Sequence, residues 1–113
     1  MDCLFCKIAG GEVPSDILHQ DDRVIVIRDI NPQAPVHLLV MPREHIASLR
    51  DITDANASLI GHMALVANQM AEREGVMEKG YRLAINCGDE GGQTVGHLHA
   101  HLLGGRQLSG RLG

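Results

Sequence analysis

The longest periodic run of apolar positions lies between Asp54 and Glu74 and predicts a helix. Its apolar residues recur at steps of four, three and four positions, so they share one face. These residues are Leu59, Met63, Val66 and Met70. Thr53 or Asp54 can cap the start of this helix, and Gly75 fits its C-terminal stop. We therefore expect one long helix with a single buried face.

Shorter apolar runs predict strands on both sides of this helix. They cover residues 24–27, 36–41, 81–86 and 96–103. Asp21-Asp22 reads as a turn, two prolines make 31–35 a loop, and three glycines interrupt 87–94. Residues 2–11 allow one or two helical turns before Gly10-Gly11. Strands followed by a helix and more strands predict an α+β fold with a mainly antiparallel sheet.

Composition narrows the class of protein. A chain of 113 residues fits one domain, residues 1–113, and with 2% aromatic residues its core must be aliphatic. The net charge of −4 disfavours a nucleic-acid partner, and no apolar run approaches membrane-spanning length. Three cysteines without a leader segment make no disulfide framework. We therefore expect a cytoplasmic protein with neither nucleic acid nor membrane as a partner.

Three histidines alternate within five residues: His97, His99 and His101. On a strand they share one face, where three rings that titrate near neutrality have no packing rationale. A lone histidine such as His19 or His62 reads as an ordinary polar side chain. For the alternating three, two chemistries stay open: ligation of a metal ion, or nucleophilic and acid–base catalysis on a phosphoryl group.

The glycine-rich loop ahead of these histidines favours the second chemistry. Glycines at 88, 91 and 92 let backbone N–H groups converge on an anion. Asn86, Gln93 and Thr94 add neutral hydrogen-bond donors. An anion cradle beside a row of imidazoles indicates a phosphate-bearing substrate.

The segment His97–Leu103 resembles the signature of the histidine triad (HIT) family, His-x-His-x-His followed by two apolar residues. The chain is most similar to the Hint branch of this family, the purine nucleoside phosphoramidases. Four segments carry the resemblance: residues 29–35, residues 36–42 with His45, residues 86–94 and residues 97–107. It implies a five-stranded mainly antiparallel sheet with one long helix and a short N-terminal helix.

The resemblance also implies catalytic roles. His99 would be the nucleophile that attacks the α-phosphorus, giving a nucleotidyl-histidine intermediate. Its other ring nitrogen would donate to the carbonyl of His97. His101, with Asn86 and Thr94, would donate to phosphate oxygens, and His37 would belong to a proton relay that helps the amine depart.

The resemblance further implies binding groups around the nucleotide. Asp29 would accept from the ribose hydroxyls, and Gly92 and Gln93 would belong to the phosphate loop. An apolar slot would hold the purine, formed by Leu4, Phe5, Ile8, Ile27 and Ile30. Asp29 can equally cap the turn that follows it, and the apolar residues can equally be ordinary core.

Cys3 and Cys6 have the spacing of zinc ligands, although a redox pair or plain buried thiols have the same spacing. Resemblance to zinc-binding relatives implies a structural zinc on Cys3, Cys6, His45 and His97. No cofactor is then required for catalysis.

We therefore predict a nucleotide phosphoramidase that acts on purine nucleoside 5′-phosphoramidates. The resemblance implies a homodimer, and the short tail after Gln107 leaves the choice of leaving group open. The alternatives are a dinucleoside polyphosphate hydrolase of the same superfamily, a metal-dependent hydrolase and a nucleotide-binding regulatory module.

Overall fold

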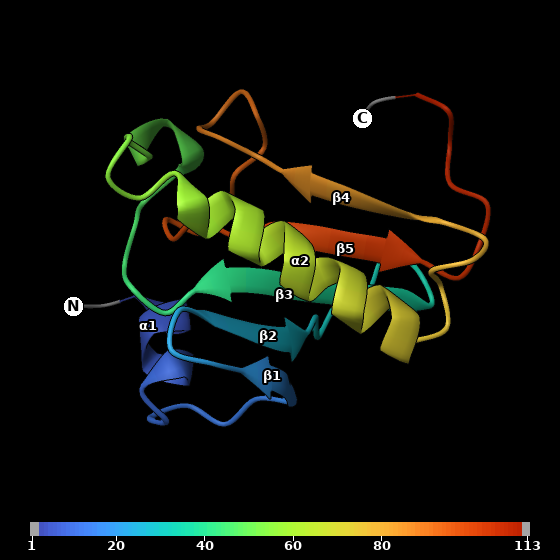
Figure 1. The fold of residues 1–113 in the computed structure, drawn as a ribbon, viewed down its shortest axis with the longest axis horizontal. Helices are drawn as coiled ribbons and strands as arrows, with labels where there is room; N and C mark the ends of the chain where they lie inside the picture. The colour runs from blue at the N-terminus through green and yellow to red at the C-terminus, as the bar shows by residue number, and fades with distance from the viewer. Residues whose placement is uncertain (1–2, 112–113) are drawn as a thin grey trace.

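The computed structural model describes residues 3–111, which form one antiparallel five-stranded sheet with two α-helices (Figure 1). The strands lie in the order β1-β2-β3-β5-β4. The elements are α1 (Leu4–Ala9), β1 (Ile17–Gln20), β2 (Val24–Arg28), β3 (Val36–Pro42), a 3-10 turn (Leu49–Asp51), α2 (Ser58–Arg73), β4 (Tyr81–Ile85) and β5 (Ala100–Gly104). This confirms the α+β prediction. Within residues 3–111, no helix has the length and apolar character that crossing a bilayer requires.

Helix α2 lies diagonally across one face of the sheet and builds the larger core (Figure 1). Its predicted face is buried, with Met63 and Val66 each 1% exposed. These side chains pack against Val24, Val26 and the residues of β3 and β5 that point the same way. Burying such a face is the main source of stability for a helix of this length.

The two ends of α2 differ in how well the sequence predicts them. The prediction that the helix starts at Asp54 and is capped by Thr53 or Asp54 is wrong, because it begins at Ser58. The side-chain oxygen of Asn56 accepts a hydrogen bond from the Thr53 N–H at 2.7 Å, which stabilises a separate turn first. Gly75 does end the helix, with φ at +76°.

The opposite face of the sheet carries a smaller core under α1. Phe5 and Ile8 pack there against Ile25, Ile27 and two residues of β3. Alternate residues of β2 therefore face two different cores, which explains its uninterrupted apolar run. Asp2, the first residue of the predicted helical stretch, lies outside the described residues.

Two strands depart from the prediction. Strand β1 was not predicted, because Ile17–Gln20 is half-exposed and irregularly paired and so lacks a clear apolar pattern. The prediction that a strand runs from Gly96 is wrong, since β5 begins only at Ala100. The N–H of Leu98 donates to the carbonyl of Ile46 at 2.7 Å, outside the β3–β5 ladder.

A polar cluster ties α2 to the β1–β2 turn. One carboxylate oxygen of Asp21 lies 2.8 Å from Nε2 of His19 and 2.9 Å from Nε2 of His62, which belongs to α2. The other oxygen accepts from the backbone N–H groups of Arg23 and Val24. Burial acts to raise the pKa of Asp21, but these hydrogen bonds together hold it well below its usual range. His19 and His62 therefore have a structural role.

Candidate active site and metal group

A pocket of about 570 Å³ opens on the sheet face opposite α2. His37, His99 and His101 line it together. So do most residues predicted to bind substrate, namely Leu4, Phe5, Ile8, Ile27, Asp29, Ile30, Asn86, Gly92 and Thr94. Two predicted residues, His97 and Gln93, are not part of the lining. The pocket thus gathers segments that are far apart in the sequence.

The expectation that all three histidines lie on one strand is wrong, because His97 and His99 precede β5 and only His101 belongs to it. His99 is nevertheless held in one orientation by the segment before β5. Its Nδ1–H donates to the carbonyl oxygen of His97 at 2.7 Å. A neutral imidazole carries one N–H, so Nε2 of His99 keeps its lone pair. Ring edges of Phe5 and His101 lie against it, with centroids at 5.2 and 5.0 Å. The ring is 4% exposed and has the tautomer that a nucleophile requires.

A second pair of imidazoles makes a directed hydrogen bond. The backbone N–H of Gln33 donates to Nδ1 of His37 at 3.0 Å, so the single proton of neutral His37 is on Nε2. That nitrogen lies 2.9 Å from Nδ1 of His101. When His37 Nε2–H donates to His101, the proton of His101 is on its Nε2. The relay runs from the 31–35 loop toward the pocket.

Asp29 offers a second acceptor to the same proton. Its Oδ2 lies 3.3 Å from His37 Nε2, and its Oδ1 accepts from the N–H of Asn31 at 2.8 Å. Asp29, His37 and His101 lie close enough together to ligate a metal. The Gln33 N–H argues against that, because a metal on Nε2 would leave His37 with no proton on either nitrogen. The cluster is better described as a hydrogen-bonded relay.

Burial favours the neutral forms of His37 and His101. It lowers the pKa of His37, against a smaller opposing effect from the Asp29 carboxylate. Burial also lowers the pKa of His101, and the neighbouring imidazoles lower it further. Neutral rings with fixed tautomers can accept and donate protons in definite directions.

The glycine-rich loop is held in shape by Gln93. Its side-chain oxygen accepts from the N–H of Gly88 at 3.0 Å, and its Nε2 donates to the carbonyls of Ala47 and Val95. The Gln93 amide is therefore engaged within the protein, and its role as a donor to substrate stays a prediction. Gly88 and Gly92 adopt φ values of +73° and +82°, which glycine alone adopts easily.

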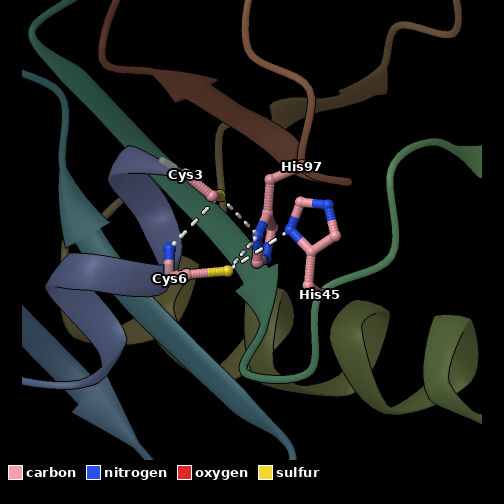
Figure 2. A group of neighbouring side chains, drawn as sticks. All are labelled: Cys3, Cys6, His45 and His97. Carbon is pink, nitrogen blue, oxygen red and sulfur yellow. Dashed lines mark hydrogen bonds between the residues drawn. The ribbon is translucent and has the colours of Figure 1, made fainter. Parts of the chain in front are cut away.

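Four predicted metal ligands converge beside this pocket (Figure 2). Sγ of Cys3 lies 3.2 Å from Nδ1 of His97, and Sγ of Cys6 lies 3.3 Å from Nδ1 of His45 and 3.5 Å from that of His97. These separations match the roughly 3.5 Å edge between sulfur and nitrogen in a tetrahedral zinc site. The chemistry and the spacing of the donors both fit zinc.

The surroundings prepare two of these ligands. Nε2–H of His97 donates to the carbonyl oxygen of Pro42 at 2.8 Å, so its Nδ1 lone pair faces the sulfurs. Cys3 caps helix α1, and its Sγ accepts from the N–H of Cys6. Burial raises the pKa of the Cys6 thiol, and the adjacent Cys3 thiol raises it further. A bound cation would offset this effect by stabilising the thiolates.

Sequence reasoning missed three groups that set this geometry, and all are main-chain atoms or depend on them. They are the Gln33 N–H on His37, the Pro42 carbonyl on His97, and the Ile46 carbonyl that holds Leu98. The only sign of the Gln33 N–H in the sequence was that Gln33 lies within the predicted 31–35 loop. His97 contributes its carbonyl to the nucleophile and its ring to the metal group.

Comparisons with known proteins agree with this arrangement. Residues 2–112 match the family model described as "Scavenger mRNA decapping enzyme C-term binding". The chain is 49% identical to the purine nucleoside phosphoramidase of Escherichia coli K12 over 93% of this chain and 88% of that protein. A HIT family hydrolase from Legionella pneumophila superposes with a TM-score of 0.96, at 46% identity over 99% of this chain and 100% of that one. A Zn-bound histidine triad family protein from Mycobacterium smegmatis has a TM-score of 0.83 and 35% identity, over 98% and 82% of the two chains.

Proposed function

We propose that this chain, a hydrolase of the histidine triad family, cleaves the P–N bond of purine nucleoside 5′-phosphoramidates. The observation that carries this proposal is the fixed tautomer of His99. Its Nδ1–H is committed to the His97 carbonyl, so its Nε2 lone pair is available in a pocket that His101, Asn86 and Thr94 also line. We take residues 1–113 as a single domain of this family.

In the first step, Nε2 of His99 attacks the α-phosphorus and the P–N bond breaks. The leaving nitrogen takes up one proton, which His101 supplies from its Nε2. Asn86, Thr94 and the backbone around Gly92 line the pocket where the phosphoryl oxygens would lie. This step leaves a nucleotidyl group on His99 and releases the amine.

In the second step, water attacks the same phosphorus and the bond to His99 breaks. The water's proton returns to His101, so the nucleoside monophosphate leaves and the enzyme regains its starting protonation. Preorganised donors stabilise the charge that develops in both steps. The hydrogen bond from His37 keeps His101 in the tautomer that the cycle requires.

The apolar part of the pocket supports binding of a purine. Ile30 lines the pocket and is 90% exposed, so its apolar surface is available to a ligand. Leu4 is 49% exposed and lines the same pocket, whereas Phe5 is buried. A base inserted there would cover the exposed side chains. Asp29 lies on the same lining and would accept from the ribose hydroxyls.

We also propose a structural zinc on Cys3, Cys6, His45 and His97. A set of two sulfurs and two nitrogens makes a closed site, so zinc would brace α1 against the residues that precede β5 and would not activate water. Elemental analysis should find one zinc per chain. Substituting Cys3 and Cys6 with Ser should remove it and lower Tm, and an unaltered protein free of zinc would contradict the assignment.

We further propose that the chain forms a homodimer through β4 and α2. β4 is an outer strand of the sheet, and an unpaired strand edge favours pairing with another chain. Leu65 of α2 and Leu83 of β4 are large apolar side chains that are 53% and 37% exposed. Light scattering should report a dimer, and L83R should convert it to monomers.

Cysteines without disulfides support a location in the reducing cytoplasm.

Mass spectrometry of enzyme quenched during turnover of adenosine 5′-phosphoramidate tests the function. We expect a nucleotidyl adduct on His99 and release of adenosine monophosphate. A His99→Asn variant should bind the monophosphate yet form no adduct, with turnover lower by orders of magnitude. Normal turnover by this variant would refute the covalent route. Failure of the unaltered enzyme to cleave any phosphoramidate would refute the function.

A further inference from the structure

His37 faces two acceptors with a single proton. Because the Gln33 N–H occupies Nδ1, the one proton of the neutral ring is on Nε2. Nε2 lies 2.9 Å from Nδ1 of His101 and 3.3 Å from Oδ2 of Asp29. The carboxylate is the farther acceptor but carries a negative charge, and charged acceptors form stronger hydrogen bonds. The two acceptors therefore compete for one donor.

The outcome of this competition affects His101. When His37 donates to His101, Nδ1 of His101 must be the acceptor, so its own proton is on Nε2. When His37 instead donates to Asp29, nothing on the His37 side fixes the tautomer of His101. His37 is 4% exposed, so water does not readily replace either acceptor.

Asp29 can also be reached from the pocket. Its side chain is 18% exposed and belongs to the pocket lining, together with His37 and His101. Its Oδ1 already accepts from the Asn31 N–H. Because a carboxylate oxygen can accept more than one hydrogen bond, Oδ2 can take a further donor besides His37. A ribose hydroxyl that donates to Oδ2 would satisfy the acceptor that competes for the His37 proton.

We propose that Asp29 is a positioning residue that couples ribose recognition to the donor state of His101. With a ribose in place, Asp29 is satisfied by hydroxyl groups, and His37 directs its proton to His101. Without ribose hydroxyls, the carboxylate competes for that proton, and His101 is held as an Nε2–H donor for only part of the time. This inference rests on the proposed function and adds a reason for the enzyme to act on ribonucleotides.

Kinetics with paired substrates test the coupling. The substrates are adenosine 5′-phosphoramidate and its 2′,3′-dideoxy analogue, and the enzymes are the unaltered protein, Asp29→Ala and the exposed-turn control Asp22→Ala. For the unaltered enzyme, the dideoxy substrate should lower kcat about tenfold or more as well as raise KM, because a positioned proton donor is lost. In Asp29→Ala the competing acceptor is gone, so the two substrates should have nearly equal kcat.

A residue that only binds ribose would change KM and leave kcat equal for both substrates in every variant, which would overturn the proposal. Asp22→Ala should reproduce the unaltered enzyme with both substrates. If no enzyme cleaves either substrate, the proposed function fails, and the coupling is then judged by a measurement that needs no turnover.

That measurement is the nitrogen NMR spectrum of histidine-labelled protein. Adenosine monophosphate should fix His101 as the Nε2–H tautomer, whereas the 2′,3′-dideoxy monophosphate at saturation should leave a mixture of tautomers. In Asp29→Ala both nucleotides should give the fixed tautomer. The same His101 spectrum with both nucleotides in the unaltered protein would overturn the coupling.

Discussion

Replacing Gly91 with alanine is the most direct test of how the glycine-rich loop supports the site. A Cβ at this position would lie 2.3 Å from the carbonyl oxygen of Cys87 and 2.9 Å from its backbone nitrogen. That is about 1 Å short of ordinary contact, and neither backbone atom can rotate away as a side chain could. The loop must therefore shift by about 1 Å. Misplacing catalytic groups by this distance costs about 100-fold in rate.

The assay is kcat/KM for adenosine 5′-phosphoramidate, together with thermal unfolding. We expect kcat/KM to fall by about 100-fold, and overpacking to cost about 1–3 kcal/mol of stability. For a domain of this size that lowers Tm by about 4–12 °C. Gly96→Ala is the matched control, because a Cβ there meets nothing within 4 Å. Equal kcat/KM for the two variants would refute the reasoning.

Three further predictions concern other parts of the molecule. The depressed pKa of Asp21 stabilises the fold above the unfolded value of about 4, and this stabilisation is lost as pH falls through the folded pKa. Asp21→Asn should thus lower Tm at pH 7 and progressively less below pH 4, whereas Asp22→Asn should change little; a pH-independent deficit would contradict this. Met63→Ala should cost about 2–5 kcal/mol in denaturant unfolding, because Met63 is 1% exposed; a loss under 1 kcal/mol would show that its core repacks. Gln93→Ala should weaken binding of adenosine monophosphate about tenfold by calorimetry, since three hydrogen bonds that hold the loop disappear; unchanged affinity would refute its role.

The sequence predicted those elements whose apolar pattern reflects their own burial. Helix α2 and the central strands follow from periodicity because their buried faces are continuous. Strand β1 was missed because pairing with β2 places it there, and its own residues carry little pattern. The starts of α2 and β5 were wrong because Asn56 and Ile46 take backbone hydrogen bonds that the pattern does not record.

The candidate site was predictable to the extent that side chains carry it. Alternation identified the imidazole row, and the resemblance supplied the four ligands that the structure brings together. The resemblance also supplied the His97 carbonyl that fixes the His99 tautomer. The Gln33 N–H and the Pro42 carbonyl were not predictable, because they are main-chain atoms. A peptide group looks the same at every position, so sequence alone gives no sign of where it will be aimed.

The carbonyl of His97 has a consequence for how this enzyme tolerates mutation. Because a main-chain oxygen orients His99, no substitution at position 97 can delete that acceptor, although any substitution there removes one of the four clustered ligands. Damage to the proposed zinc brace of the N-terminal segment and damage to the orientation of the nucleophile are thus separable at a single residue.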